Sequence, residues 1–340
     1  MKVLLTGHQG YLGTVMAPVL IAGGHEVVGL DTGLFADCVL GPQPADPPGL
    51  AVDLRDVTPA HLAGVDAVIH LAALSNDPLG SLAPDITYEI NHHASVQLAK
   101  AAKEAGVSRF LYASTCSVYG ASGGAGLVTE DAMLAPVTPY AESKVRVEAD
   151  LVDLADDSFS PTSLRNATAF GFSPRLRADI VLNNLVAHAV LTGTVLVLSD
   201  GTPWRPLVHA ADIASAFTAT LAAPRDAVHA EAFNVGHPAN NLTVAQIAET
   251  VVAAVPGSTL KITGEAGGDP RSYQVDFAKM TAAVPGFVPS WGVDDGAAEL
   301  AAAYVEHGLT EDAFTNKFTR LAVLKARQDA GELDDAMRVR

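Results

Sequence analysis

The sequence predicts an α/β fold in which a doubly wound parallel sheet is covered by helices on both faces. Short, nearly continuous apolar runs, the pattern of strands buried on both sides, recur as "KVLLTG", "HEVVGLD", "DAVIHLAA" and "RFLYAST". Segments with helical periodicity separate these runs, so strand and helix alternate along the chain. A glycine-rich loop joins the first run to the first helix. Together these features predict parallel strands joined by crossover helices.

The alternation is regular up to about residue 165 and looser afterwards. Helices are expected over residues 11–22, 86–105 and 140–154. Beyond them, "LRNATAFG" and "FNVG" are typical of strands, while "DIVLNNLVAHAVLTG" and "TVAQIAETVVAAV" are typical of helices. We expect one domain over residues 1–165 with later returns around 205–235, a smaller α/β domain formed by 166–204 and 236–305, and a charged amphipathic helical tail over 306–340.

Composition and charge argue against several function classes. The 340 residues are 49% hydrophobic, enough for a large core, so disorder is not expected. With 21 basic and 38 acidic residues the net charge is −17, which repels phosphate backbones and argues against a nucleic-acid partner. Two cysteines, Cys38 and Cys116, offer neither a disulfide framework nor a metal site. No apolar run approaches the roughly eighteen residues that cross a bilayer, so we expect a cytoplasmic protein without a membrane partner.

The glycine-rich loop "TGHQGYLG" predicts a dinucleotide site. Gly7, Gly10 and Gly13 allow a tight turn and a close approach of the backbone to a pyrophosphate, which the N-terminus of the following helix also attracts. Three spaced glycines alone are a weak signal, but here a strand precedes them, a helix follows them, and Asp31 ends the second strand. The Asp31 carboxylate can accept both ribose hydroxyls of NAD, and it repels the 2′-phosphate of NADP. The alternative is a structural turn that binds no nucleotide.

A tyrosine and a lysine stand four residues apart in "TPYAESKVRVEAD", so Tyr140 and Lys144 share one face of a helix. Taken alone, such a pair is more often one inward-facing aromatic ring and one solvated charge. A phenol with an ordinary pKa near 10 needs roughly 3 units of depression, about 4 kcal/mol, to act as a base at neutral pH. An ammonium ~4 Å away contributes on the order of 4 kcal/mol at an effective dielectric constant near 20, so Lys144 alone nearly suffices.

The motifs, taken in order, are similar to those of the extended short-chain dehydrogenase/reductase family, which includes NAD-dependent nucleotide-sugar epimerases and dehydratases. "TGHQGYLG", "DLRD", "HLAA", "YEINHHAS", "YASTCSVYG" and "PYAESK" carry the resemblance, which covers roughly residues 1–300. It implies a Rossmann domain and a smaller domain that closes over a nucleotide-sugar. The cofactor-binding residues that it implies are Gly7, Gly10, Tyr11, Leu12, Gly13, Asp31, Asp53, Leu54, Leu71, Ala72, Ala73, Asn91, Ala113, Tyr140 and Lys144. Thr115, Tyr140 and Lys144 are the implied catalytic residues, with Thr115 bonded to the sugar oxygen whose proton Tyr140 handles.

The residues after Thr115 discriminate among the family's reactions. Members that dehydrate hexoses carry an Asp–Glu pair there, decarboxylating members a Glu at the place of Ser117, and members that epimerise C3 and C5 a cysteine at that place. This sequence has Cys116 one residue earlier, where strand alternation points it to the opposite face and predicts a packed thiol. With those reactions set aside, the catalytic groups that are left are Thr115, Tyr140, Lys144 and NAD. They suffice for C4 epimerisation through a 4-keto sugar or for simple ketone reduction. Asp31 favours epimerisation, because epimerases retain and recycle NAD.

The substrate side is similar to that of UDP-sugar 4-epimerases. Asn184 in "LNNL", Arg205 in "WRPLVHAADIA" and Arg271 in "GGDPRSY" match residues that contact the diphosphate. Arg175 and Arg177 in "SPRLRAD" stand where some epimerases meet a uronic-acid carboxylate, which a bidentate guanidinium suits. Loop arginines are otherwise ordinary solvated charges, and Ser75 either touches the sugar or caps a turn. The expected substrate-binding residues are Ser75, Thr115, Thr168, Arg177, Asn184, Arg205 and Arg271.

Two other functions stay open at this level. An NAD(P)H-dependent 4-ketoreductase of a nucleotide-activated deoxysugar needs the same residues. A non-catalytic NAD-binding sensor or scaffold belongs to a different class, but such a protein need not keep Thr115, Tyr140 and Lys144. The resemblance also implies a homodimer in which the helices over 86–105 and 140–154 pair into a four-helix interface through their alanine-rich faces.

Overall fold

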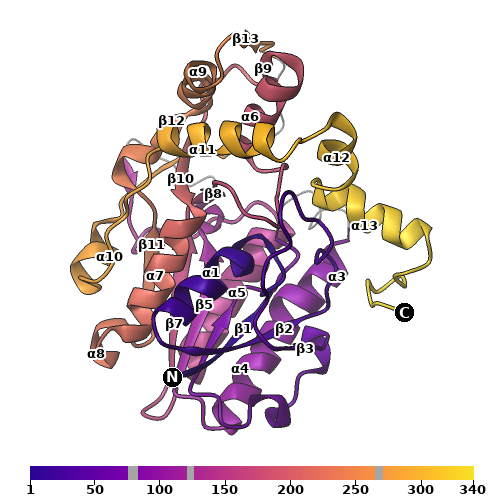
Figure 1. Cartoon of the computed structure of the whole chain (residues 1–340). Coiled ribbons are helices and arrows are strands. Elements are labelled where there is room, and N and C mark those ends of the chain that lie inside the picture. The colour runs from indigo at the N-terminus through magenta and orange to yellow at the C-terminus, as the bar shows by residue number, and fades with distance from the viewer. Residues whose placement is uncertain (76–82, 121–125, 265–270) are drawn as a thin grey trace.

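The computed structural model describes residues 1–75, 83–120, 126–264 and 271–340 and centres on a parallel sheet (Figure 1). Within these residues seven strands lie in the order β11-β7-β5-β4-β1-β2-β3, and every neighbouring pair is parallel. Their bounds are β1 (Lys2–Thr6), β2 (Glu26–Asp31), β3 (Gly49–Ala51), β4 (Ala67–His70), β5 (Arg109–Thr115), β7 (Ser160–Asn166) and β11 (Ala232–Val235). The predicted doubly wound α/β sheet is confirmed.

Helices cover both faces of this sheet. α1 (Tyr11–Ala22) and α7 (Ala210–Ala222) pack on one face and share a buried apolar cluster with it. α4 (Ala94–Glu104) and α5 (Pro139–Leu154) pack on the other face around a second cluster. Because crossover helices join parallel strands, the carboxyl ends of β1, β2, β4 and β5 meet at one edge of the sheet, which is where such sheets bind ligands.

The helix expected over residues 86–105 is interrupted. α3 (Pro84–Tyr88) runs into a π-helical turn (Glu89–His93) before α4 begins. Such a turn inserts an extra residue into the helix and changes the direction of the side chains in it. The hydrophobic period that predicts one continuous helix does not reveal this local widening.

A second group of elements lies above the sheet in Figure 1 and builds its own buried core. Its strands form a three-stranded sheet in the order β12-β10-β8 and a β13-β9 pair, and a separate β14-β6 pair lies nearby. The strand bounds are β6 (Leu127–Val128), β8 (Thr168–Phe170), β9 (Thr194–Val197), β10 (Trp204–His209), β12 (Asn241–Thr243), β13 (Thr259–Ile262) and β14 (Gln274–Val275). Its helices are α6 (Val181–Thr192), α9 (Val244–Ala254) and α11 (Val293–Glu306). Two further helices, α8 (Arg225–Val228) and α10 (Ala278–Ala283), lie beside the main sheet (Figure 1), and Val228 and Met280 belong to its buried cluster. The proposed domain limits stay a prediction.

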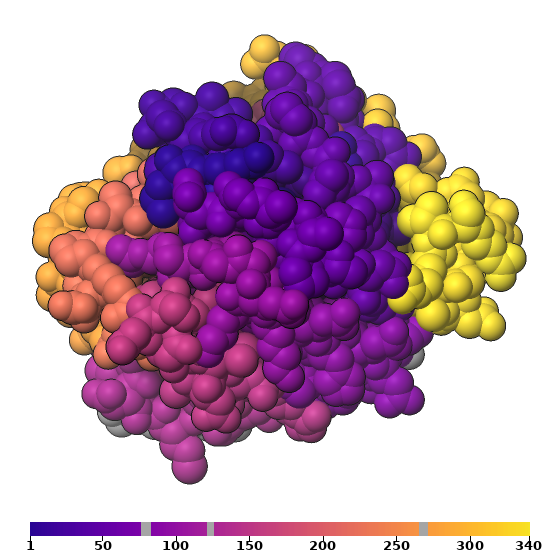
Figure 2. Space-filling model, turned by 90° about the horizontal axis from the view of Figure 1, so that it is seen from below, coloured from indigo at the N-terminus to yellow at the C-terminus, as the bar shows by residue number. Residues whose placement is uncertain are grey.

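Residues 307–340, which we call the C-terminal segment, do not form the single amphipathic helix that the sequence predicts. α12 (Glu311–Asn316) and α13 (Arg320–Asp329) are separate, and a bridge between Leu333 and Val339 closes a final turn. Phe318 lies between the two helices, where it is buried and its carbonyl oxygen accepts from Ala178 N (2.9 Å). Figures 1 and 2 show this segment in yellow, lying against the first hundred residues.

The alanines of α4 do not form an outward dimerisation face. Ala94, Ala99 and Ala102 are 2% exposed or less because they pack toward the sheet within the subunit. The expected pairing through an alanine-rich face is therefore wrong for α4, and the homodimer stays a prediction.

Two classes of feature are absent from the described part of the chain. No helix there is long and apolar enough to pass through a bilayer. No group of three or more His, Cys, Asp or Glu side chains there is arranged to hold a metal ion. Cys38 and Cys116 are both buried free thiols.

Candidate active site

A cavity of about 730 Å³ lies at the carboxyl edge of the seven-stranded sheet. Its walls come from the ends of β1, β2, β4 and β5 on one side and from β8, α6 and β10 on the other. Of the predicted site residues, those that line it are Gly7, Gly10, Tyr11, Leu12, Gly13, Asp31, Asp53, Leu54, Leu71, Ala72, Ala73, Ser75, Ala113, Thr115, Tyr140, Lys144, Thr168, Arg177, Asn184, Arg205 and Arg271. The structure thus brings together every predicted site residue except Asn91.

The loop after β1 leaves no room for side chains at its glycines. Gly7 has φ +73°, and a Cβ there would lie 2.9 Å from Ala72 N. A Cβ on Gly13 would lie only 2.2 Å from Gly7 O. Within the described chain no side chain caps α1 at Gly10, and no acidic residue lies in its first turn. The backbone N–H groups at this helix start are therefore available to an anion.

Two aspartates line the same end of the cavity, but their carboxylates are held differently: backbone N–H groups hold Asp31, and an arginine side chain holds Asp53. The Asp31 oxygens accept from Gln9 N (3.0 Å) and Gly33 N (2.9 Å), which fixes the carboxylate at the end of β2. Asp53 is held by Arg55, whose Nε donates to Oδ1 (2.9 Å) and whose Nη2 donates to Oδ2 (2.6 Å). Burial raises the pKa of Asp53, but the hydrogen bonds from Arg55 outweigh burial and keep that pKa below its ordinary value.

The segment after β4 forms a wall that is supported from behind. Thr6 Oγ1 accepts from Leu71 N and Ala72 N, both at 3.2 Å, and lies 2.7 Å from His70 Nδ1. The other ring nitrogen of His70 lies 2.8 Å from Ser95 Oγ on α4. Burial lowers the pKa of His70 to about 3, so the ring is neutral and ties β4 to its neighbours.

Asn91 lies behind this wall instead of lining the cavity. Its side chain accepts from Leu74 N (2.8 Å) and donates to Leu74 O (3.0 Å). Because both of its polar groups are engaged there and it is only 1% exposed, Asn91 positions the wall. The expectation that it contacts the cofactor finds no support in this geometry.

The first turns of α5 present Tyr140 and Lys144 to the end of β5. Thr138 caps this helix through its side chain. Lys144 Nζ donates to Ala113 O (2.7 Å) and lies 5.7 Å from the ring centroid of Tyr140. Because Thr115 ends β5 two residues after Ala113, strand and helix bring Thr115, Tyr140 and Lys144 to one cavity.

Lys144 is 3% exposed, and this burial governs its charge. Burial lowers the pKa of Lys144 to about 7, against the opposing effect of the Glu148 carboxylate one helical turn later. Glu148 is itself occupied, because Arg165 Nη2 donates to it (2.7 Å) and Ser114 Oγ also donates to it. Lys144 therefore gains or loses its proton near neutral pH, and a charge placed beside it would shift its pKa.

The chain leaves β5 immediately after Thr115. Cys116 begins a 3-10 turn, is 1% exposed, and its thiol lies 3.1 Å from Arg165 O. Because Cys116 is buried in the core, the predicted packed thiol is confirmed, although a turn and not strand alternation points it away. Burial also raises the pKa of the thiol. Ser117 lines the cavity, and its Oγ lies 3.4 Å from Arg271 Nη1.

At the far end of the cavity, two arginines from distant segments meet. Arg205 Nη1 donates to Arg271 O and to Trp204 O, the latter at 2.8 Å. Asn184 from α6 and Thr168 from β8 line the cavity with them. This end therefore gathers two cations and two neutral polar side chains, a combination suited to a phosphorylated ligand.

The two arginines of "SPRLRAD" have different surroundings. Arg175 is fully buried and forms two hydrogen bonds with Asp46 (2.6 and 2.7 Å), so the expectation that it meets a substrate carboxylate is wrong. Arg177 lines the cavity and donates to Asp179 from Nε (3.0 Å) and Nη2 (3.2 Å), while Nη1 donates to Ser75 Oγ (3.1 Å). The charge of Arg177 is therefore balanced within the protein.

Comparison with known proteins supplies the family. The sequence model of the protein family described as "NAD dependent epimerase/dehydratase family" matches residues 3–236 of this chain. The chain belongs to this family. Like its relatives, this epimerase/dehydratase is an NAD-dependent enzyme, and the glycine-lined turn, the open start of α1 and the fixed Asp31 carboxylate fit that cofactor.

Individual relatives of this epimerase/dehydratase include both reaction types. A UDP-glucose 4-epimerase from Bacillus subtilis (strain 168) is 29% identical over 262 residues, which cover 69% of this chain and 77% of that protein. The solved structure of MoeE5 in complex with UDP-glucose and NAD is 27% identical, with a TM-score of 0.76 over 91% of this chain and 100% of that one. The dTDP-glucose 4,6-dehydratase DesIV from Streptomyces venezuelae, solved with NAD bound, is 25% identical, with a TM-score of 0.78 over 92% of this chain and 100% of that one.

Asp31→Ser in this epimerase/dehydratase is expected to shift the ratio of NADP to NAD affinity about 10- to 100-fold toward NADP. The carboxylate would lose its charge-assisted hydrogen bonds to the ribose hydroxyls, and its repulsion of a 2′-phosphate would disappear. Calorimetric titration of both dinucleotides measures the ratio. Glu26→Gln, at the exposed start of the same strand, is the matched control and is expected to leave the ratio unchanged. An unchanged ratio in Asp31→Ser would contradict the role given to Asp31.

Among the cavity residues of this epimerase/dehydratase that were not predicted, two come from the far end of the chain. Arg320 and Met337, both from the C-terminal segment, also line the cavity. Neither belongs to a recognisable motif, and both are hundreds of residues from the glycine loop. Only the folded chain reveals that they approach it.

Proposed function

We propose that this enzyme inverts the configuration at C4 of a nucleotide-diphosphate hexose through a transient 4-keto sugar. The observation that carries the proposal is that Thr115, Tyr140 and Lys144 line one cavity with the dinucleotide loop. Tyr140 takes the proton from the 4-hydroxyl and later returns it, Thr115 bonds the same oxygen, and Lys144 favours the phenolate. NAD, when bound, supplies the reversible hydride acceptor that this chemistry requires.

The acidic residues of the cavity favour epimerisation over dehydration. Within the described residues, the carboxylates that line it are Asp31, Asp53 and Asp179. Asp31 and Asp53 belong to the dinucleotide end, and Asp179 pairs with Arg177. At the positions where dehydrating relatives carry an acid and a base, this chain has the buried Cys116 and the hydroxyl of Ser117.

An uncharged sugar is favoured, because the charges of Arg175 and Arg177 are already balanced by aspartates of the protein. Arg175 is occupied by Asp46, and Arg177 is occupied by Asp179, so neither is left to neutralise a uronic-acid carboxylate. Arg205 and Arg271 lie together at the phosphate end. We therefore infer that the substrate is an unmodified hexose such as that of UDP-glucose, and that UDP-glucuronic acid is the poorer substrate.

The test combines cofactor identification with product analysis. Protein purified from cells is denatured, and the released dinucleotide is identified by mass spectrometry. Fresh enzyme is then incubated with UDP-, dTDP-, GDP- and ADP-hexoses carrying deuterium at C4, without added cofactor. NMR is expected to show the C4 epimer with its deuterium retained, because hydrogen removed from C4 returns within the same site. Tyr140→Phe serves as the inactive control.

Each other outcome points to a different function. Stoichiometric consumption of NADH or NADPH with a 4-keto deoxysugar would establish a ketoreductase. A 4-keto-6-deoxy product from a hexose would establish a dehydratase. Bound NAD with no product and no exchange at C4 across the panel would favour a sensor or scaffold. Any of these three results would replace the proposed epimerisation.

A further inference from the structure

The C-terminal segment packs against the dinucleotide end of the cavity. Leu333 and Met337 are buried in one apolar cluster with Leu74, which lines the cavity in the segment after β4. Leu34, three residues beyond Asp31, packs against the same cluster. An apolar contact of this kind is what holds a segment against the rest of a fold, so the segment is docked and not a loose tail.

Polar contacts fasten the same segment to the "DLRD" loop. Arg55, which holds Asp53, also donates from Nη1 to Ala336 O (2.8 Å). Arg338 donates to the Asp56 carboxylate at 2.6 and 3.2 Å. The loop that carries the expected cofactor-binding residues Asp53 and Leu54 is therefore bridged directly to the last turn of the chain.

That last turn presents Met337 to the cavity in an unusual backbone conformation. Met337 has φ +58°, in the left-handed region of backbone conformation that residues other than Asn, Asp and Gly rarely adopt. Asp334 Oδ1 holds the turn by accepting from Ala336 N (2.9 Å) and Arg338 N (2.8 Å). The Met337 side chain is 4% exposed and lines the cavity. A flexible, polarisable thioether suits the flat face of an aromatic ligand.

Arg320 places a buried positive charge at the cavity. It is 2% exposed, its guanidinium lies 4.3 Å over the Phe35 ring, and Nη2 donates to Arg175 O (3.3 Å). Its Nη1 is buried and has no hydrogen-bond partner among the described residues. Burial lowers the pKa of Arg320 to about 10, so the group stays charged at neutral pH.

Within the described residues, no carboxylate is left over to balance the charge of Arg320. The carboxylate that acts on it, Asp179, already pairs with Arg177. The nearby Cys38 thiol is neutral at pH 7, because burial raises its pKa. An anion entering the cavity would satisfy both the charge and the open N–H group. Arg175 connects this charge to α1, because its carbonyl oxygen accepts from Arg320 and its Nη1 donates to Thr14 Oγ1, and the start of α1 attracts a pyrophosphate.

We propose that the C-terminal segment completes the cofactor site, with Arg320 binding the pyrophosphate of NAD and Met337 covering its adenosine end. The segment then acts with the glycine loop to retain NAD between turnovers. This inference concerns the cofactor alone and does not depend on which sugar reaction the enzyme catalyses.

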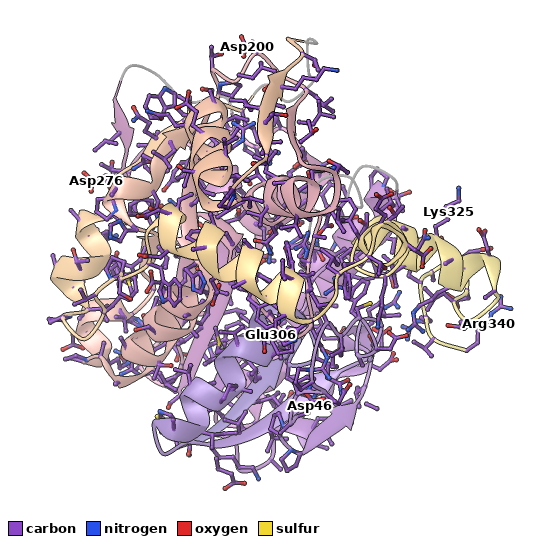
Figure 3. The ribbon with its side chains drawn as sticks, turned by 45° about the horizontal axis from the view of Figure 1, so that its top comes forward. Asp46, Asp200, Asp276, Glu306, Lys325 and Arg340 are labelled. Atoms are coloured by element: carbon purple, nitrogen blue, oxygen red, sulfur yellow. The ribbon has the colours of Figure 1, made fainter. Side chains whose placement is uncertain are left out.

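The test measures NAD release from the full-length protein. The variants are Arg320→Ala, Arg320→Lys and Met337→Gly, with Lys325→Ala as the control, because Lys325 lies on the same helix and points away from the protein (Figure 3). Readouts are the NAD content after purification, the NAD dissociation rate after dilution, and the rise in melting temperature on adding NAD. Arg320→Ala is expected to speed dissociation about 10- to 100-fold, with partial recovery in Arg320→Lys. Met337→Gly is expected to speed it about 3- to 10-fold, and Lys325→Ala to match the wild type.

Two results would overturn the inference. NAD retention at the wild-type level in both Arg320→Ala and Met337→Gly would exclude the segment from the site. A raised KM for the nucleotide-sugar with unchanged NAD retention in Arg320→Ala would assign Arg320 to the substrate phosphates instead. If Arg320→Ala does not fold, Met337→Gly decides the question, because glycine adopts the left-handed backbone without strain. Product analysis is a separate assay, so failure here leaves the proposed epimerisation standing.

Discussion

Tyr140→Phe is expected to lower kcat about 10³-fold while leaving the NAD affinity within about twofold of wild type. The ring still fills its place beside Lys144, whose Nζ lies 5.7 Å from the ring centroid, so the cavity keeps its shape. What is lost is the hydroxyl that takes the proton from the sugar and returns it. Turnover is measured by NMR detection of the epimer, and NAD affinity by calorimetry.

Tyr88→Phe is the matched control for this substitution. Tyr88 lies on α3, its hydroxyl donates to Glu142 (2.7 Å), and it is not among the residues that line the cavity. Its replacement removes the same atom from a neighbouring tyrosine and is expected to leave kcat unchanged. Undiminished turnover in Tyr140→Phe would refute the role of Tyr140 as the proton-transfer group. Equal losses in both variants would point to a disturbed fold.

Lys144→Met is expected to lower kcat/KM on the order of 10³-fold at neutral pH, because the ammonium contributes about 4 kcal/mol toward ionising the phenol. Without it, Tyr140 must ionise unaided, so the rising limb of the pH–rate profile should move toward the ordinary phenol pKa near 10. A stopped-flow or NMR rate profile from acid to alkaline pH measures this shift. A profile that keeps its wild-type position would contradict the electrostatic role of Lys144.

The burial of Lys144 also predicts how stability depends on pH. The folded chain releases the Lys144 proton with a pKa of about 7, whereas the unfolded chain keeps it up to the ordinary value of 10.5. Between these values the unfolded state binds more protons, so the free energy of unfolding rises with pH through this group. From about pH 7 to about pH 9, the cofactor-free wild type should gain about 2 kcal/mol relative to Lys144→Met. Urea unfolding at both pH values measures the difference.

Lys100→Met is the control for both lysine measurements. Lys100 is exposed on α4 and is not among the residues that line the cavity. Its replacement removes one ammonium without changing a buried charge, so neither the rate profile nor the pH dependence of stability should move. If the free energy of unfolding of the wild type, relative to that of Lys144→Met, falls from pH 7 to pH 9, then Lys144 does not carry the depressed pKa.

Motifs whose residues are close in sequence could be interpreted before the fold was known. The turn at Gly7 and Gly13 depends on contacts within its own loop and with the adjoining strand, so the glycine spacing carries the information. Tyr140 and Lys144 share a helix face by local geometry, and Asp31 reaches the cavity because it ends a parallel strand.

Residues whose surroundings come from distant segments could not be interpreted in this way. The sequence alone does not distinguish Arg175 from Arg177. In the structure, Asp46 from a remote loop binds Arg175, whereas Asp179 binds Arg177. Asn91 matches a motif, but the π-helical turn directs it to the Leu74 backbone. For Arg175 and Asn91 the deciding partner lies outside the motif, and nothing in the local pattern specifies it.

By itself, then, the sequence determined the parallel sheet, the dinucleotide loop and the tyrosine–lysine pair, because periodicity and short spacing dictate local backbone geometry. Only the tertiary structure decided which cations are neutralised and that the last residues of the chain border the cofactor end of the cavity. Those outcomes depend on desolvation and on charge pairs between remote segments, and these energies exist only once the chain has folded.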